Sequence, residues 1–97
     1  MSAYLICNIT VTDPVGFGRY RELAAPIIAQ FGGRYLVRGG AVTELEGNPG
    51  LQRVVVLQFD TMDALKTFYF SPEYTAAKAV REAAATADVA IVEGYAA

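Results

Sequence analysis

Two glycine pairs, at residues 32–33 and 39–40, bracket a five-residue segment that carries two arginines. Glycine adopts positive φ angles without steric cost, so each pair marks a point where the chain leaves one element and enters another. Segment 34–38 between them is predicted to be a strand. In a regular strand Arg34 and Arg38 would lie on the same face. The fold must therefore accommodate a short arginine-bearing strand between two turns.

The rest of the chain supplies three further strands and three helices. Runs rich in β-branched and aromatic residues predict strands, and a capping residue followed by proline predicts a helix start at two places. A shorter helix capped by Asp60 or Thr61 lies between the third strand and the last helix. The expected strands are 3–11, 34–38, 52–59 and 88–93, the long helices are 14–31 and 72–86, and an irregular extension of the second strand covers 42–46.

This order, β-α-β-β-α-α-β, is typical of the α+β ferredoxin-like plait. We expect one domain over residues 1–97, with a four-stranded antiparallel sheet, strands one and three in its centre, and all helices on one face. The first, third and fourth strands are nevertheless apolar on much of both faces. Four strands of about six residues leave an uncovered face on the order of 400 Å², the size of patch that suits an interface. Homodimerisation through this sheet face is the expected answer.

Composition excludes several classes of function. The eight basic residues are spread along the chain and the net charge is −2, so no nucleic-acid-binding face is expected. There is no histidine, which removes Ser-His-Asp and Cys-His catalysis and most zinc and iron sites. We therefore expect no metal and no cofactor. The sequence has no secretory leader pattern and no apolar run long enough to span a membrane, so a cytoplasmic protein without membrane contact is expected.

The chain carries six motifs in a fixed order: Ala3-Tyr4-Leu5-Ile6, Val11-Thr12-Asp13-Pro14, the glycine-bracketed segment 32–40, Leu45-Glu46-Gly47, Ser71-Pro72-Glu73-Tyr74 and Val92-Glu93-Gly94. With these motifs it resembles the domain of unknown function 1330 family. The resemblance implies membership of the dimeric α/β-barrel superfamily, in which two plaits pack sheet to sheet. Gln58 and Phe70 stand where that family more often has acidic residues, so no acidic role is expected at these positions.

Two arginines and one amide are the first candidates for ligand binding. Arg34 and Arg38 could hold a carboxylate or an enolate, because guanidinium groups pair with oxyanions through two parallel hydrogen bonds. The alternative is a structural ion pair with Glu44, Glu46 or a carboxylate of a partner chain. Asn8 is a polar residue inside a core strand, and its amide must bond either to a ligand or to neighbouring backbone.

Helix residues supply the remaining candidates. Tyr20, Tyr69 and Tyr74 could act as acids or ligand clamps in a pocket between sheet and helices, or could simply pack in the core. Arg81 lies seven residues after Tyr74, on the same helix face, and could close that pocket; the alternative is a solvated or salt-bridged side chain. Glu93 is a candidate general base near Asn8, or an exposed strand end. Cys7 is interpreted as inert packing.

Two functions follow from these readings. The first is a homodimer that binds a small organic, anionic ligand in a cleft between sheet and helices, with or without cofactor-independent catalysis. The superfamily includes small monooxygenases and lactone isomerases, and the resemblance favours this function by analogy. The second is a non-catalytic interaction or structural module without a pocket. The two differ in whether Arg38, Asn8 and Tyr74 line one cavity.

Overall fold

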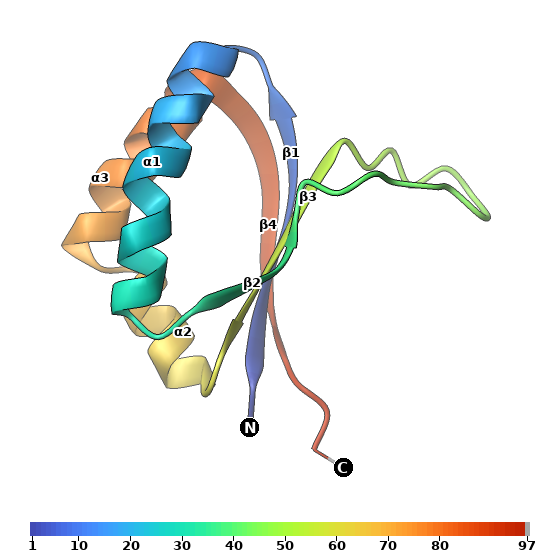
Figure 1. Ribbon diagram of the computed structural model, residues 1–97. Helices are drawn as coiled ribbons and strands as arrows, with labels where there is room; N and C mark the ends of the chain where they lie inside the picture. Colours follow the sequence, from blue (N-terminus) through green and yellow to red (C-terminus); the bar gives the residue numbers. More distant parts are fainter. Residues whose placement is uncertain (97) are drawn as a thin grey trace.

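A computed structural model describes residues 1–96 of the chain (Figure 1). In these residues four strands and three helices follow one another in the predicted order, and every strand pairing is antiparallel. The elements are β1 (Ala3–Val11), α1 (Pro14–Gln30), β2 (Arg34–Arg38), β3 (Arg53–Phe59), α2 (Met62–Tyr69), α3 (Pro72–Ala84) and β4 (Ala85–Glu93).

The strands form one sheet in the order β2-β3-β1-β4, so the first and third strands are central as expected. All three helices cover the same face of this sheet, and the opposite face carries no helix (Figure 1). We call that opposite side the open face. The α+β ferredoxin-like plait predicted from the sequence is thus confirmed.

Each helix begins at the predicted capping residue. The side chain of Asp13 accepts a hydrogen bond from the Gly16 amide. In the same way, Thr61 accepts from the Ala64 amide and Ser71 from the Tyr74 amide. A cap of this kind satisfies an amide that the helix itself leaves free. Pro14 and Pro72 occupy first-turn positions where no amide is needed.

The core lies between the helices and the covered sheet face. Its largest fully buried side chains are Phe59, Phe68 and Leu65, from β3 and α2. The Phe68 ring lies 5.2 Å from that of Phe59 and 4.4 Å from that of Tyr74, between ring centroids. Aromatic packing therefore joins the sheet to both C-terminal helices at one point, beside the site described below.

The last strand begins earlier than predicted. α3 ends at Ala84 and β4 starts at Ala85, with no loop between them, whereas the sequence predicted a helix to 86 and a strand from 88. The Ala84 carbonyl accepts hydrogen bonds from the Thr12 and Asp13 amides, and Ala85 pairs with Val11. Pairing with the end of β1 therefore overrides the helix propensity of the alanines.

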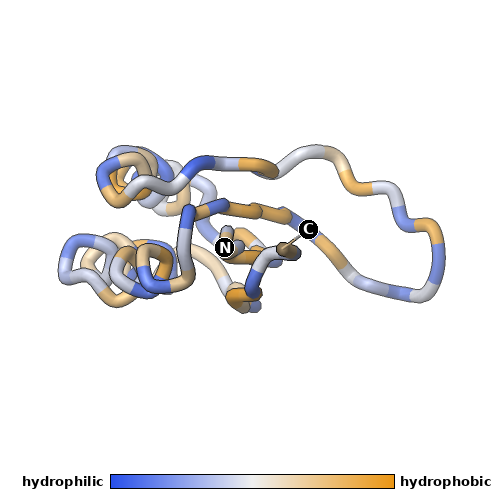
Figure 2. Tube along the Cα trace, turned by 90° about the horizontal axis from the view of Figure 1, so that it is seen from below, coloured by the Kyte–Doolittle hydropathy of each residue, from blue (hydrophilic) through white to orange (hydrophobic). Residues whose placement is uncertain are grey.

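The predicted extension at 42–46 is not a strand. Residues 39–52 form an irregular segment, here called the arm, that runs out from the sheet on the open-face side (Figures 1 and 2). Leu45 on the arm is 89% exposed. Asn8 of β1 anchors its return: its Oδ1 accepts from the Gln52 amide at 2.8 Å and its Nδ2 donates to the Gly50 carbonyl at 3.3 Å.

A β-bulge in β2 overturns the prediction that Arg34 and Arg38 share a face. Arg34 pairs with Gln58, but the register shifts between Tyr35 and Val37, and Arg38 pairs with Val55. Gln58 and Val55 lie three residues apart in β3, so they point to opposite faces of the sheet. The extra residue in β2 therefore turns Arg38 toward the helices and leaves Arg34 on the open face.

The open face is uncovered and carries exposed apolar side chains. Its exposed side chains include Ile6 of β1, Val37 of β2 and Val92 of β4. Within residues 1–96, no helix is both long enough and apolar enough to cross a membrane.

Candidate functional site

A small cavity lies between the covered sheet face and α1. Its volume is about 30 Å³, and it is partly open to solvent. Apolar side chains of β1 and β3 form much of its wall. Apart from the Cys7 thiol, the polar side chains that line it are three arginines (Arg21, Arg38 and Arg53) and three tyrosines (Tyr20, Tyr35 and Tyr74).

The arginines come from three different elements and rest on aromatic rings. The Arg53 guanidinium lies 5.4 Å from the ring centroid of Phe17, and that of Arg21 lies 6.0 Å from the same ring. The Arg38 guanidinium lies 4.4 Å from the ring of Tyr35. Cation–π contact of this type holds a guanidinium in place without neutralising it.

No carboxylate lies within ion-pair distance of these three arginines in the described part of the chain, where the one ion pair joins Arg34 to Asp60. Burial, together with the positive charges of Arg21 and Arg38, lowers the pKa of Arg53 from its usual value. The Nε of Arg53 is buried and has no hydrogen-bond partner among residues 1–96. The cavity thus carries concentrated positive charge with unused donor capacity.

Gly39 brings the backbone close to this cluster. Its φ angle is +72°, in the region that favours glycine, and its amide donates to the Val54 carbonyl at 2.8 Å. A Cβ atom at this position would collide with the Arg53 guanidinium. The first glycine of the second pair therefore ends β2 and also leaves room for Arg53.

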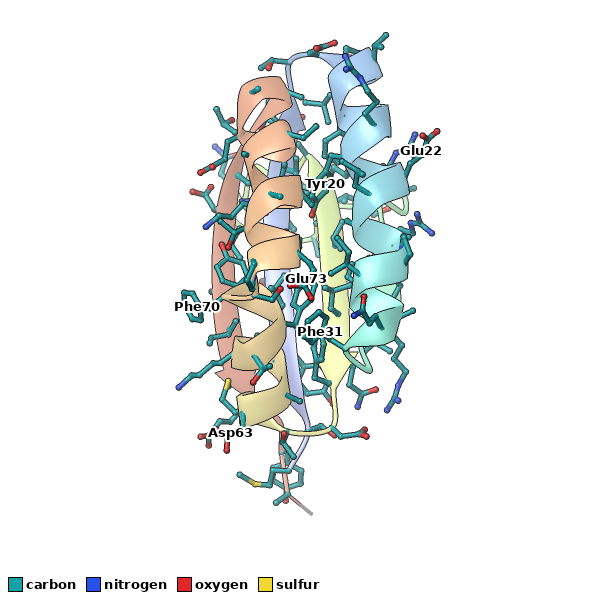
Figure 3. The ribbon with its side chains drawn as sticks, turned by 90° about the vertical axis from the view of Figure 1, so that its left-hand side faces the viewer. Tyr20, Glu22, Phe31, Asp63, Phe70 and Glu73 are labelled. Atoms are coloured by element: carbon teal, nitrogen blue, oxygen red, sulfur yellow. The ribbon has the colours of Figure 1, made fainter. Side chains whose placement is uncertain are left out.

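A second polar group lies deeper, in the seam between α1 and α3. Tyr20 points from α1 into this seam (Figure 3), and its hydroxyl lies 2.7 Å from the hydroxyl of Tyr74. Arg81 Nη1 donates to the Tyr74 hydroxyl at 2.9 Å. Arg81 and Tyr74 lie two helical turns apart on α3, so their side chains share one face.

Arg81 is an unusual residue for this position. It is only 5% exposed, its Nε has no partner among residues 1–96, and its hydrogen-bonded neighbour is a phenol rather than a carboxylate. Buried arginines are normally paired with acids. Burial raises the pKa of Tyr20 and, more strongly, that of Tyr74, so both phenols keep their protons at neutral pH.

Cys7 lines the same cavity from β1. Burial raises the pKa of its thiol to about 11, although the positive charge of Arg81 acts in the opposite direction. The side chain is therefore a neutral thiol at physiological pH, and the nucleophilic thiolate is absent.

The structure brings together three of the candidates named from the sequence. Arg38, Tyr20 and Tyr74 line one cavity, and a fourth candidate, Arg81, donates a hydrogen bond to the Tyr74 hydroxyl. The alternative of a solvated Arg81 is wrong. Tyr69 packs against Tyr74, with 5.5 Å between ring centroids, but its ring lies under Lys78 and outside this cavity.

The other candidates lie elsewhere. Arg34 is on the open face, where its Nε donates to Gln58 at 2.9 Å, and Asn8 uses its amide to hold the arm. The predicted closeness of Glu93 to Asn8 is wrong: Glu93 pairs with Ala3, five residues along β1 from Asn8, and is exposed.

Sequence reasoning missed Arg21, Arg53 and Tyr35. Arg53 alternates with Val55 and Leu57 along β3, so its position on the covered face was readable from the period of two. Arg21 follows Phe17 by four residues and therefore shares its helix face. Tyr35 lies on the face opposite Arg34 in any strand, but the bulge that places Arg38 on the same face as Tyr35 leaves no mark in the sequence.

A family model and several solved structures relate this chain to known proteins. The model of a family described as a domain of unknown function, DUF1330, matches residues 2–95. The chain belongs to the DUF1330 family. The resemblance noted from its motifs is thus confirmed, and a search of curated proteins gives no match to this DUF1330 protein.

Several solved structures share its fold at low sequence identity. The RPA0582 protein of unknown function from Rhodopseudomonas palustris is 15% identical, with a TM-score of 0.77 over 99% of this chain and 84% of that one. SnoaB, a cofactor-independent oxygenase from Streptomyces nogalater, is 15% identical, with a TM-score of 0.68 over 99% and 95% of the two chains. A dimeric ferredoxin-like protein of unknown function from Jannaschia sp. CCS1 is 16% identical, with a TM-score of 0.66 over 97% and 100%.

Proposed function

We propose that this DUF1330 protein binds a small organic anion in the cavity between its sheet and helices. One observation carries the proposal: the guanidinium groups of Arg21, Arg38 and Arg53 converge on the cavity with no carboxylate within ion-pair distance among residues 1–96. Like charges held close together in a partly buried site repel one another, and an anion removes that cost. A carboxylate also matches the fork of a guanidinium group.

The dimensions of the cavity limit the ligand. The cavity holds about 30 Å³ and is walled by apolar side chains, while Arg21 and Arg38 are exposed at its edge. A ligand with a short apolar chain and one terminal carboxylate satisfies both features. We therefore take short-chain carboxylic acids as the ligand class.

The same lining bears on catalysis. No aspartate or glutamate lines the cavity, Cys7 is protonated, and Glu93 is exposed at the end of β4. A reaction in this cavity would therefore stabilise negative charge that develops on the ligand, through arginine and phenol donors, without a protein base. SnoaB, which shares the fold, is described as working without a cofactor. Binding is the function proposed, and a cofactor-independent reaction would build on it.

Isothermal titration calorimetry with a matched pair of probes tests the proposal. Butyrate and butyramide have the same shape, and only butyrate is charged. We expect butyrate to bind with an affinity that falls as salt concentration rises, and butyramide to give no heat. Replacing Arg53 by glutamine should weaken butyrate binding about tenfold or more, since the ligand loses its most buried cation.

Arg19→Gln is the matched control, because Arg19 is an exposed arginine of α1 that does not line the cavity. It should bind butyrate like the unchanged protein. Equal binding of butyrate and butyramide, or no binding of either, would contradict the proposal and favour a module without a ligand site. Circular dichroism of each variant shows whether the fold is kept.

We further propose that two copies of the chain associate through their open faces. Structural neighbours are described as dimeric proteins, and the open face exposes Ile6, Val37 and Val92. Two sheets packed face to face stand about 10 Å apart. The arm has seven residues on each side of its midpoint, which reach up to about 23 Å. Each arm is thus long enough to pass the partner's sheet and bury Leu45 there.

A further inference from the structure

The hydrogen-bond network at the inner end of the cavity leaves one proton without an acceptor. Arg81 is a pure donor, so the Tyr74 hydroxyl accepts from its Nη1. The hydroxyls of Tyr20 and Tyr74 share one hydrogen bond, in which either oxygen can be the donor. Two phenols carry two protons, and the bond between them uses one.

In either arrangement one phenolic proton is left without a partner beside the cavity. If Tyr74 donates to Tyr20, the free proton belongs to Tyr20; if Tyr20 donates to Tyr74, the free proton belongs to Tyr74. Neither hydroxyl has another acceptor among residues 1–96, and both tyrosines line the cavity. The buried charge of Arg81 polarises the pair, which makes the free O–H a stronger donor.

From this count we infer that the ligand carries, besides its carboxylate, an oxygen atom that accepts a hydrogen bond from the Tyr20–Tyr74 pair. The inference rests on the proposed function, which places the carboxylate at Arg21, Arg38 and Arg53. Apolar side chains, Leu5 and Leu57 among them, line the same cavity as both polar groups. The ligand class is then a short oxo acid, either as the ketone or as its enolate.

An oxo acid also accounts for the buried cation. A ketone oxygen accepts the free phenolic proton, and an enolate oxygen would in addition gain from the charge of Arg81 behind Tyr74. A plain fatty acid would leave the polarised O–H facing a methyl group. That loss is the cost of an unsatisfied buried donor, and it sets the expected preference between the two ligand types.

Calorimetric titration with three four-carbon acids tests the inference. Butyrate, 2-oxobutyrate and acetoacetate share one carboxylate and one length, and differ in whether and where they carry the oxo group. We expect at least one oxo acid to bind about three- to tenfold more tightly than butyrate. The double substitution Tyr20→Phe with Tyr74→Phe should bring that ratio to one, because no phenolic proton remains.

Single substitutions test directly whether either phenol can supply the free proton. Tyr20→Phe keeps the Arg81–Tyr74 contact, and the proton of Tyr74 is then free for the ligand. This variant should therefore retain a preference for the oxo acid, even if the double variant fails to fold. Tyr95→Phe is the control, since Tyr95 is exposed and does not line the cavity. Arg38→Gln should weaken all three acids by a similar factor and leave their ratio unchanged.

The outcomes separate the two proposals. If all three acids bind equally well, the oxo-acid inference is wrong and anion binding stands. If none binds, anion binding itself is wrong. If Tyr20→Phe removes the preference completely, the Tyr74 hydroxyl does not reach the ligand, and the exchangeable pair described here is wrong.

Discussion

At the scale of single residues, burial decides which side chains of the cavity can react. Cys7, Tyr20 and Tyr74 all keep their protons at neutral pH, because burial raises the pKa of each. The charged groups of the site are all cations. Hydrogen-bond donors thus outnumber acceptors in the cavity, which is the reverse of what a general base needs.

The thiol of Cys7 gives a pH-dependent prediction. Its folded-state pKa of about 11 lies above the unfolded value of 9.0, so the unfolded chain loses its proton first. Stability that is present below about pH 9 is therefore lost as pH rises toward 11, by roughly 2–3 kcal/mol. Arg81 and the phenols of Tyr20, Tyr35 and Tyr74 interact with the thiol. Burial raises the pKa of these phenols as well, so they lose stability in the same direction, and the comparison with a variant at position 7 isolates the thiol.

Urea unfolding at several pH values checks this. Cys7→Ala lowers stability at neutral pH because it removes a buried side chain, but its loss of stability between pH 9 and pH 11 should be smaller than that of the unchanged protein. Parallel pH profiles for the two proteins would show that the thiol ionises normally in the folded state.

At the scale of elements, caps and turns are readable from the sequence and strand irregularities are not. Asp13, Thr61 and Ser71 cap the helices as expected, because a short polar side chain before a helix satisfies a free amide whatever the tertiary context. The bulge at Leu36 depends on pairing with β3, which local sequence does not specify. The extra residue in β2 places Arg38, and not Arg34, at the cavity with Arg21 and Arg53.

Ser71 gives a prediction at this scale. Its hydroxyl accepts from the Tyr74 amide and donates to the Phe68 carbonyl at 2.7 Å, and it is buried. Ser71→Ala removes the cap of α3 and leaves the Tyr74 amide without its partner, while the Phe68 carbonyl keeps the backbone amide of residue 71, so unfolding free energy should fall by about 1–2 kcal/mol. Thr61→Ala, at the exposed cap of α2, should cost less. Thermal or urea unfolding measures both, and equal losses would contradict the role of burial.

At the scale of the whole molecule, the sequence predicted the plait. It also predicted that the helices cover one face of the sheet and leave the other open. An apolar pattern on both faces of β1, β3 and β4 indicated that something covers the side without helices. The sequence predicted an irregular extension over 42–46 but not that it leaves the sheet as an arm, because its apolar residues Val42 and Leu45 imitate a strand.

The open face gives the prediction at this scale. Light scattering after gel filtration should give twice the chain mass of 10.4 kDa at micromolar concentration. Val56→Asp places a charge in the middle of the open face on β3, opposite Ile6, and should yield a monomer. Glu82→Asp, on an exposed position of α3, is a control that should stay dimeric. A monomeric parent protein, or a dimeric Val56→Asp variant, would overturn the open-face interface.

The most direct test of anion binding is an NMR titration that follows the arginine Nε–H signals while butyrate is added. Arg53 has a buried Nε without a partner among residues 1–96, whereas the Nε of Arg34 already donates to Gln58 on the open face. We predict that the Arg53 signal shifts and saturates while the signals of Arg34 and Arg19 stay unchanged. An unmoved Arg53 signal, or equal shifts of all arginines, would contradict a specific anion site in this cavity.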